Sequence, residues 1–379
     1  MGIVQSIGEA KPLDAARLGR AKIAYATHRV PFRDIQTLIA SETAAPRAGD
    51  LVLARVGRIG QHRRIELRNG RRAILFEGDE IVLCYGNRYA PDQFEAYVPG
   101  DLGPCQMAAA GGVAGRVVAS HARMKAPTEI TPLGLLADRQ GKVINLNRYA
   151  LRPRGAQVSA PIFAVVGTSM NAGKTTAAAY LVRGLAQSGL RVGAAKVTGT
   201  GAGGDLWHMT DAGAAAVLDF TYAGHATTYL ADDAALQEIF LTLTGELDAS
   251  GADAIVIEIA DGLNQTETAR LVTSPLFRQR VSAIVFAAAD AMGAKAGYDW
   301  LLRHQLPVAA VSGLMTASPL GAREAAQTVA APVLGIDDLA SPERIEQVFR
   351  PYIDGRRAAP ASPVARRADG PELPAEMHA

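Results

Sequence analysis

Cysteine is almost absent from this sequence, which has only Cys84 and Cys105 in 379 residues. Two cysteines are too few for a disulfide framework, and their separation matches no common metal-binding spacing. Such low cysteine usage is typical of a protein that works in a reducing compartment. We therefore predict a cytoplasmic protein that is not held together by disulfides.

Long hydrophobic runs and an excess of charge are missing as well. No apolar stretch reaches the roughly 18 residues needed to span a bilayer, and residues 1–12 lack the basic start and apolar core of a signal peptide. The 39 basic residues nearly balance the 37 acidic ones, and no basic block stands out. We therefore predict neither a membrane nor a nucleic acid as a partner.

The length of 379 residues predicts two domains. Before residue 152, short apolar or alternating runs are separated by turns that contain Gly, Asn or Pro. The predicted strands cover residues 51–56, 72–76, 80–84, 93–98 and 113–119, with a helix and a further strand (22–26) between residues 13 and 44. Short strands at this spacing indicate a small barrel or sandwich. We predict a β-rich N-terminal domain over residues 1–152, whose role the sequence leaves open.

After residue 161 the pattern changes to strands that alternate with helices. The predicted strands cover residues 162–166, 191–196, 252–259, 281–286, 307–311 and 331–335, and the predicted helices cover 175–187, 234–247, 265–271 and 298–304. This alternation predicts a parallel sheet covered by helices on both faces. The predicted fold class is α/β: a parallel-sheet, P-loop nucleotide-binding domain over residues 160–355, preceded by the smaller β-rich domain. Residues 356–379, rich in Ala, Pro and Arg, are predicted to be a disordered tail.

A glycine-rich segment between the first of these later strands and its helix gives the clearest functional signal. Gly167 and Gly173 enclose five residues, and a Lys-Thr-Thr run follows at the start of the helix. Glycines let the backbone curl so that successive N–H groups converge on phosphate oxygens, and the helix N-terminus adds partial positive charge. The predicted nucleotide-binding residues are Gly167, Thr168, Asn171, Ala172, Gly173, Lys174, Thr175 and Thr176.

Two of these residues have specific expected roles. We expect Lys174 to face solvent and to reach the β- and γ-phosphates of ATP, and the Thr175 hydroxyl to coordinate Mg²⁺. The spacing is one residue longer than in the common phosphate-binding loop, which has four residues between its glycines. Chance is disfavoured because strand, glycines, Lys-Thr-Thr and helix occur together in the required order.

The longer loop resembles that of dethiobiotin synthetase, a member of the SIMIBI class of P-loop NTPases, where a Gly-Thr pair likewise opens the loop. The B protein of molybdopterin-guanine dinucleotide synthesis is a comparable resemblance. Further along, Lys196 ends the second predicted strand, Asp205 follows a glycine-rich stretch, and Glu258 ends the third strand. In dethiobiotin synthetase the lysine after strand two lies at the substrate and the γ-phosphate, and the acidic residues help hold magnesium. The resemblance implies Thr175, Asp205 and Glu258 as metal ligands.

This chain departs from that family after Glu258, where glycines are replaced by Ile, Ala and Asp261. Either Glu258 or Asp261 could therefore face the metal, and we predict both as catalytic residues together with Lys174 and Lys196. Lys196 and Asp205 also have plain structural interpretations, as a solvated charge at a strand end and as the N-cap of a helix over residues 206–216. A functional role is favoured because strand C-termini line the ligand crevice in such sheets.

These residues indicate an ATP-dependent enzyme that transfers the γ-phosphoryl group to a small molecule or activates a carboxylate for ligation. Such a kinase or ligase would work by positioning and charge neutralisation. The alternative is a nucleotide-hydrolysing switch or maturation factor that acts through a protein partner, since the SIMIBI class contains both kinds. Residues 168 and 169 are Thr and Ser, so the early loop lysine that acts across some dimers is missing. The enzyme is favoured, and a homodimer is left open.

We expect ATP to bind more tightly than GTP. Guanine-specific proteins of this broad fold often carry an Asn/Thr-Lys-x-Asp run after a late strand, but residues 311–318 contain neither lysine nor aspartate. Competition binding with both nucleotides in the presence of Mg²⁺ would measure the ratio of affinities. A preference of about tenfold for GTP, which equals about 1.4 kcal/mol, would reverse the assignment and favour the switch.

Overall fold

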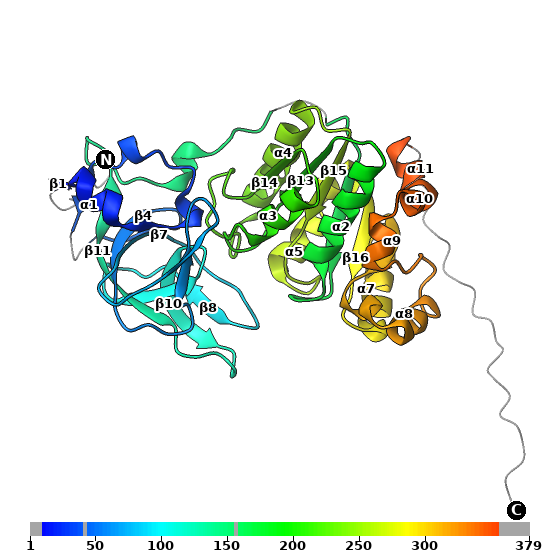
Figure 1. The fold of residues 1–379 in the computed structure, drawn as a ribbon, viewed down its shortest axis with the longest axis horizontal. Coiled ribbons are helices and arrows are strands. Elements are labelled where there is room, and N and C mark those ends of the chain that lie inside the picture. Colours follow the sequence, from blue (N-terminus) through cyan, green and yellow to red (C-terminus); the bar gives the residue numbers. More distant parts are fainter. Residues whose placement is uncertain (1–9, 41–43, 155–157, 356–379) are drawn as a thin grey trace, which may run out of the picture.

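The computed structural model describes residues 10–40, 44–154 and 158–355. Figure 1 shows two regions side by side, an N-terminal region built mainly of strands and a C-terminal region in which helices surround a central sheet. The predicted tail (356–379) lies outside the described residues. Among the residues that are described, no helix combines the length and the apolar character needed to cross a membrane.

The N-terminal region contains a nine-stranded sheet and a separate hairpin. The strands of the sheet are β1 (Ala10–Pro12), β2 (Lys22–Ile23), β3 (Thr37–Ile39), β4 (Leu51–Val56), β7 (Glu80–Tyr85), β8 (Phe94–Tyr97), β9 (Cys105–Ala109), β10 (Val113–Ser120) and β11 (Thr128–Ala137). The hairpin joins β5 (Arg64–Glu66) to β6 (Arg72–Ile74). Short helices also occur: α1 (Ala15–Arg20), η1 (Tyr25–Thr27), η2 (Phe32–Asp34) and η3 (Leu146–Tyr149).

Five of these strands close into a ring of pairings. β4 pairs with β7 and β11, β7 pairs with β10, and β9 pairs with both β10 and β11. This closed ring is a small barrel, one of the two architectures that the sequence predicts. In β4, Leu51 and Leu53 lie in one buried apolar cluster, whereas Val52 and Ala54 lie in another. A strand that is buried on both faces needs consecutive apolar residues, which is why β4 is conspicuous in the sequence.

Two strands of the ring are missing from the sequence prediction, namely β9 and β11. β11 contains Pro132, which cannot donate a ladder hydrogen bond, and its register against β4 shifts between Pro132 and Gly134. Pro and Gly argue against a strand when the sequence is considered alone. The strand predicted over residues 22–26 is shorter than expected, because β2 ends at Ile23 and the chain turns into η1.

The C-terminal region is built on a six-stranded sheet in the order β14-β13-β15-β12-β16-β17, and every neighbouring pair is parallel. The strands are β12 (Ile162–Gly167), β13 (Val192–Lys196), β14 (Ala216–Asp219), β15 (Ala254–Glu258), β16 (Val281–Ala287) and β17 (Val308–Ser312). The longer helices are α2 (Lys174–Gln187), α3 (Gly204–Asp211), α4 (Asp233–Ala249), α5 (Thr266–Val272), α6 (Pro275–Arg280), α7 (Ala291–Arg303) and α8 (Pro319–Ala326). Shorter ones are η4 (Leu314–Ala317), α9 (Ile336–Ala340), α10 (Pro342–Arg344), η5 (Ile345–Phe349) and α11 (Arg350–Ile353).

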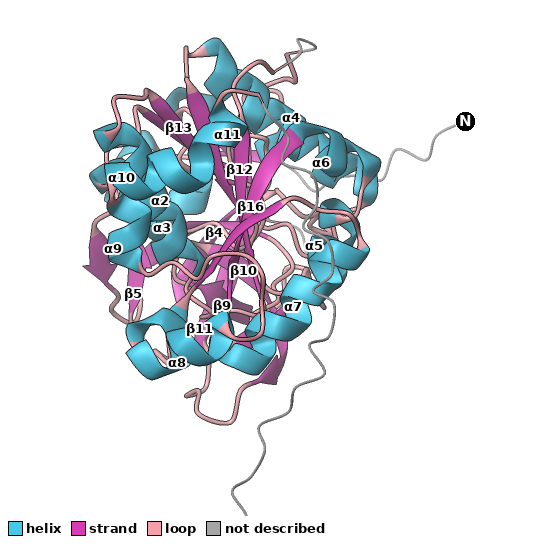
Figure 2. Cartoon of the chain, turned by 90° about the vertical axis from the view of Figure 1, so that its right-hand side faces the viewer, coloured by secondary structure: helices cyan, strands magenta, loops and turns pink. Residues whose placement is uncertain are grey.

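Helices cover both faces of this parallel sheet. Phe240 of α4 and Leu301 of α7 lie in the apolar cluster on one face, and Leu181 of α2 and Leu339 of α9 lie in the cluster on the other. Figure 2 shows the strands of the sheet between these two groups of helices. The predicted α/β class with a parallel sheet is therefore confirmed.

The sixth strand of the sheet is not the predicted one. Residues 331–335 contribute only an isolated bridge between Val311 and Val333, and β14 occupies the edge beside β13 instead. The helix expected over residues 206–216 ends at Asp211, because Gly213 adopts φ 103° and stops it. The chain can then enter β14 at Ala216.

Gly297 permits the close contact between α7 and the sheet, since an added Cβ would lie 1.9 Å from the ring of Phe286 in β16. We expect Gly297→Ala to lower the free energy of unfolding by about 1–3 kcal/mol, because the core must move to accept the methyl group. Gly19→Ala in α1 is the matched control, since nothing lies within 4 Å of its added methyl and alanine favours a helix. Urea denaturation would compare the variants, and an unchanged midpoint for Gly297→Ala would contradict the prediction.

Candidate nucleotide-binding site

Three neighbouring strands end at the same edge of the parallel sheet and bring predicted site residues together. β12 ends at Gly167, β13 at Lys196 and β15 at Glu258. Lys196 and Glu258 are register partners across β13 and β15, and Glu258 also pairs with Val165 of β12. Because the strands are parallel, the loops that follow them share one crevice at their carboxyl ends.

Residues 167–176 form the predicted strand–loop–helix turn between β12 and α2. Asn171 (φ 65°) and Gly173 (φ 96°) adopt left-handed conformations. A Cβ on Gly173 would lie 2.9 Å from the backbone nitrogen of Leu314, so this position requires glycine. α2 begins at Lys174 without a side-chain cap on its first amides. No side chain therefore competes with an anion for these N–H groups.

The predicted nucleotide-binding residues fall into two groups. Asn171, Gly173, Lys174, Thr175 and Thr176 line the cleft above the loop, whereas Gly167, Thr168 and Ala172 do not. The second group holds the loop in shape. The Thr168 N–H donates to the Ala287 carbonyl at 3.0 Å, and the Ala172 carbonyl accepts from the Leu314 N–H at 2.9 Å.

Lys174 does not face solvent, and that expectation is wrong. The residue is 5% exposed, and its ammonium Nζ donates to the Ser169 carbonyl at 2.7 Å. Burial lowers the pKa of Lys174, against the opposing effect of Glu258 and Asp261. The side chain folds back across the loop because a buried ammonium needs a hydrogen-bond acceptor and the loop carbonyl is within reach.

Glu258 is a buried carboxylate directly beneath the start of α2. It is 2% exposed, and its Oε1 accepts a hydrogen bond of 3.0 Å from the Thr175 hydroxyl. Its Oε2 is buried and has no hydrogen-bond partner among the described residues. Burial raises the pKa of Glu258, although Lys196 acts in the opposite direction. A cation beside Thr175 would satisfy this orphaned oxygen.

Lys196 lies between two carboxylates. Its ammonium forms an ion pair with Asp205 and lies 4.0 Å from Oε1 of Glu258. Burial alone would lower the pKa of Lys196, but the charges of Glu258 and Asp205 outweigh it and raise the pKa. Burial would likewise raise the pKa of Asp205, and Lys196 and the Thr175 hydroxyl lower it. Lys196 is therefore a paired cation whose side chain is only 13% exposed, and not a solvated charge at a strand end.

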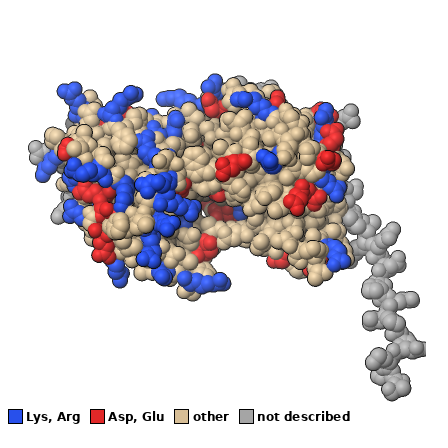
Figure 3. Space-filling model, viewed as in Figure 1, with Lys and Arg blue, Asp and Glu red and all other residues tan. Residues whose placement is uncertain are grey.

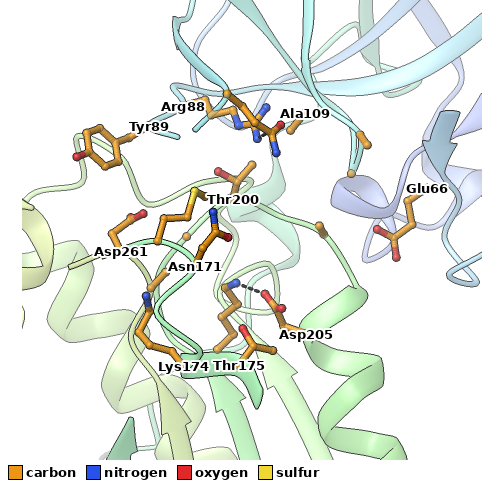
Figure 4. A pocket seen from close by; sticks show the side chains of 18 of the residues that line it. Glu66, Arg88, Tyr89, Ala109, Asn171, Lys174, Thr175, Thr200, Asp205 and Asp261 are labelled. Carbon is orange, nitrogen blue, oxygen red and sulfur yellow. Dashed lines mark hydrogen bonds and ion pairs between the residues drawn. The ribbon is translucent and has the colours of Figure 1, made fainter. Parts of the chain in front are cut away.

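Asp205 does not cap α3, because Gly203 occupies the N-cap position and Asp205 lies in the first turn. Its carboxylate points back toward Lys196 and Thr175, as Figure 4 shows. Thr175, Asp205 and Glu258 thus bring a hydroxyl and two carboxylates to one place, and these oxygen ligands fit Mg²⁺. Within the described ranges, no three His, Cys, Asp or Glu side chains converge on one point. Phosphate oxygens and water would have to complete the shell, which is usual for Mg²⁺.

Asp261 lies on the loop after β15, on the other side of the phosphate loop from Asp205 (Figure 4). It lines the cleft and has φ 61°, which is uncommon for a residue other than glycine. The loop is tightly seated, since a Cβ on the adjacent Gly262 would lie 2.0 Å from the Thr168 carbonyl. Burial raises the pKa of Asp261, against the effect of Lys174 and Lys196.

A cleft of about 860 Å³ separates the phosphate loop from the N-terminal region, and residues of both regions line it. The hollow is visible between the two regions in Figure 3, with Lys and Arg gathered beside it on the N-terminal side. The polar cleft residues of the N-terminal region, none of which the sequence indicates, are Gln61, His62, Arg63, Arg64, Glu66, Arg72, Arg88, Tyr89 and Gln93. The pairs Arg63-Arg64 and Arg71-Arg72 are the only signal in the sequence, and they are too short to stand out as a basic block.

Direct contacts hold the N-terminal region against this site. Asn171 of the phosphate loop donates from Nδ2 to Asp92 at 2.9 Å. Glu66 accepts from the Gly203 N–H at 3.1 Å, at the start of the helix that carries Asp205. The buried hydroxyl of Tyr25 donates to Asp219 at 2.7 Å. The wall of the cleft is therefore tied to the loop and to α3.

Comparison with known proteins gives structural likeness only. No family model matches the sequence, and no curated protein matches it. One solved structure with partial similarity is the signal recognition particle receptor FtsY from Elizabethkingia anophelis. The match has 16% sequence identity and a TM-score of 0.35, and it covers 57% of this chain and 75% of that chain. The signal recognition particle 54 kDa protein from Aeropyrum pernix K1, solved with GDP, has 19% identity, coverage of 55% and 50%, and a TM-score of 0.35.

A nucleotide-binding protein from Archaeoglobus fulgidus, solved with ADP, has 12% identity, coverage of 52% and 91%, and a TM-score of 0.35. At these scores the likenesses carry no argument of their own, and the assignment of the site rests on its geometry. The resemblance to dethiobiotin synthetase and to the B protein of molybdopterin-guanine dinucleotide synthesis remains a hypothesis.

We expect Lys174→Ala to remove most of the affinity for Mg-ATP and to leave the protein folded. Among the described residues the ammonium hydrogen-bonds to a carbonyl of its own loop, and Lys196 remains close to Glu258 when Lys174 is removed, so the fold should survive the substitution. Calorimetric titration with Mg-ATP would measure the affinity. Lys295→Ala is the control, because Lys295 lies on α7 and pairs with Asp299. Wild-type affinity in a folded Lys174→Ala protein would disprove the assignment of the phosphate loop.

Proposed function

We propose that the protein binds Mg-ATP in the cleft and transfers the terminal phosphoryl group, either to a small molecule or to a carboxylate that is activated for ligation. The observation that carries this proposal is the hydrogen bond between Thr175 and the buried Glu258 directly beneath the phosphate loop. A hydroxyl at the start of the helix and a carboxylate at the end of the neighbouring strand are the two protein groups that a phosphate-bound magnesium needs.

The position of each residue in the cleft determines its proposed role in binding phosphate or Mg²⁺. The amides at the start of α2 would bind the β- and γ-phosphates, and Lys174 would exchange the Ser169 carbonyl for a phosphate oxygen. Thr175, Asp205 and Glu258 would hold Mg²⁺, which supplies charge neutralisation on the phosphate oxygens when it is bound.

Lys196 and Asp261 complete the proposed catalytic set. Lys196 is held at the strand ends by two carboxylates, so it would stay charged near the terminal phosphate. Asp261 faces the cleft with a raised pKa, which suits a group that accepts a proton from an acceptor hydroxyl or amine. If the acceptor is a carboxylate, no proton needs to be removed and Asp261 would have no role as a base.

A nucleotide-hydrolysing switch that acts through a protein partner is the second candidate. The hydrogen bond between Asn171 and Asp92 favours it, because this bond would transmit a change in the conformation of the phosphate loop to the N-terminal region. The two candidates differ in what raises turnover. An enzyme would be stimulated by a small acceptor, whereas a switch would hydrolyse slowly until its protein partner is added.

ADP release in the presence of Mg-ATP would test the enzyme directly. The assay would use a panel of small carboxylic acids, amino acids and alcohols, with buffer alone as the reference. Stimulation by one class identifies the acceptor chemistry. ADP release that is slow and equal across the whole panel, in a protein that binds the nucleotide tightly, would contradict the kinase or ligase. The nucleotide-hydrolysing switch would then be the remaining candidate.

We expect Glu258→Gln to retain nucleotide but to lower turnover by about a hundredfold or more, because one preorganised charge at the metal is lost. The substitution keeps the volume of a buried side chain, so the melting temperature should change little. Glu246→Gln is the control, since Glu246 forms a surface ion pair with Arg154.

Asp261→Asn is the informative comparison for this variant. If Asp261→Asn alone abolishes turnover while Glu258→Gln stays active, the essential acid is Asp261 and not Glu258. A Glu258→Gln protein with a lower melting temperature and normal turnover would mean that Glu258 is structural. Measuring turnover and melting temperature on all three variants separates these results.

A further inference from the structure

The N-terminal wall of the cleft is strongly positive. It presents Arg63, Arg64, Arg72 and Arg88 to the cleft against a single carboxylate, Glu66. We call the four arginines the arginine wall. In the part of the chain that the structure describes, none of them forms an ion pair. A cluster of four guanidinium groups that faces a cleft with one carboxylate on the same wall is suited to an anionic ligand.

The hairpin β5–β6 places two of these arginines by strand alternation. Ile65 and Ala73 are register partners whose side chains are buried in the core of the N-terminal region. Their neighbours Arg64 and Arg72 therefore point the other way, toward the cleft. Glu66 lies opposite Arg72 and is hydrogen-bonded to the Gly203 N–H. The hairpin is thus fixed beside the helix that carries Asp205.

Arg88 is the buried member of the wall. It is 6% exposed, and its Nη2 donates to Gln93 at 2.9 Å while its Nη1 donates to the Ala108 carbonyl. Its Nε is buried and has no partner among the described residues. Burial lowers the pKa of Arg88 to about 10, and the charge of Asp92 acts against this. A buried guanidinium without a carboxylate at ion-pair distance is costly, and an anion in the cleft would stabilise it.

The neighbouring His62 is uncharged and adds nothing to the positive charge of the arginine wall. Its Nε2 lies 3.3 Å from Nη1 of Arg88. Burial lowers the pKa of His62 to about 4, so the ring is neutral near pH 7. The charge of the wall therefore comes from the arginines alone.

We propose that the arginine wall binds the carboxylate or phosphate group of a second, small-molecule substrate, opposite the nucleotide. This inference rests on the proposed function, because the second molecule would be the acceptor of the phosphoryl group. The amides and Lys174 of the phosphate loop, together with Lys196 at the end of β13, are already assigned to the nucleotide's own phosphates in the proposed function. A cleft of about 860 Å³ is near the upper end of the usual range for small-molecule sites, which leaves room for an acceptor beside the triphosphate.

The test uses the whole chain and two probes, inorganic phosphate and succinate, titrated by calorimetry with and without a non-hydrolysable ATP analogue and Mg²⁺. The wild-type protein is expected to bind one equivalent of at least one probe below about 10 mM. The double variant Arg64→Ala/Arg72→Ala is expected to weaken that binding at least about tenfold and to change the affinity for the ATP analogue less than about twofold. Both arginines are exposed, so the fold should survive the double substitution.

Arg123→Ala is the matched control, because Arg123 is exposed on the same region and lies outside the cleft. It should leave both affinities unchanged. A second variant, Arg88→Lys, keeps the positive charge but removes the planar guanidinium group. It should weaken probe binding, because the guanidinium of Arg88 contacts the anion in this proposal.

Each result bears on one of the two proposals. Absence of probe binding to the wild-type protein, with and without the analogue, would overturn the arginine wall as an anion site. A parallel loss of affinity for the ATP analogue in the double variant would also overturn it, because the arginines would then hold the nucleotide's terminal phosphate. If the wild-type protein binds a probe through the wall but does not bind the analogue, the arginine wall stands as an anion site and the proposed nucleotide function fails.

Discussion

The row of alternating charges formed by the buried Glu258 and the partly buried Lys196 and Asp205 is the constraint on which the site depends. A carboxylate as deeply buried as Glu258 is costly unless a cation lies close by, and Lys196 provides that cation at 4.0 Å. The parallel register fixes this distance, because Lys196 and Glu258 are partners on adjacent strands. Asp205 balances the remaining charge from the start of α3. Movement of Lys196 would leave both carboxylates without the cation that they share.

The parts of the structure that could be predicted from sequence are those that depend on local pattern. The apolar runs of the parallel sheet and the glycine–lysine–threonine turn each follow from residues that are close together in the chain. The start of α7 could not be predicted in this way. Gly293 and Gly297 lower the helix propensity of that stretch, and the reason for Gly297 is the ring of Phe286 on another element. β11 was missed for a similar reason, since Pro132 is tolerated only because a bulge accommodates it.

The candidate site likewise combines residues that the local sequence pattern predicts with features that depend on distant parts of the chain. Lys174, Thr175 and Glu258 could be found because each occupies a characteristic position beside a strand or helix. The conformation of Lys174 could not, since it depends on the burial of the loop and on the Ser169 carbonyl. The arginine wall could not be predicted from the sequence either. Its four arginines become neighbours of the phosphate loop only when the N-terminal region folds against the C-terminal region. In a chain of nearly balanced charge, the pairs Arg63-Arg64 and Arg71-Arg72 are too short to indicate a basic site.

The closed ring of strands in the N-terminal region also has a kinetic consequence. β4 and β7 are close in sequence, but the ring closes only when β11 pairs with β4 and β9. Pairing between distant segments is slow because the entropy of loop closure is lost before the contacts are gained. The ribosome must therefore release the chain beyond Ala137 before the barrel can form, and until then the hairpin β5–β6 has no complete core to pack against. During synthesis, this region should be among the last parts of the N-terminal half to become resistant to proteases.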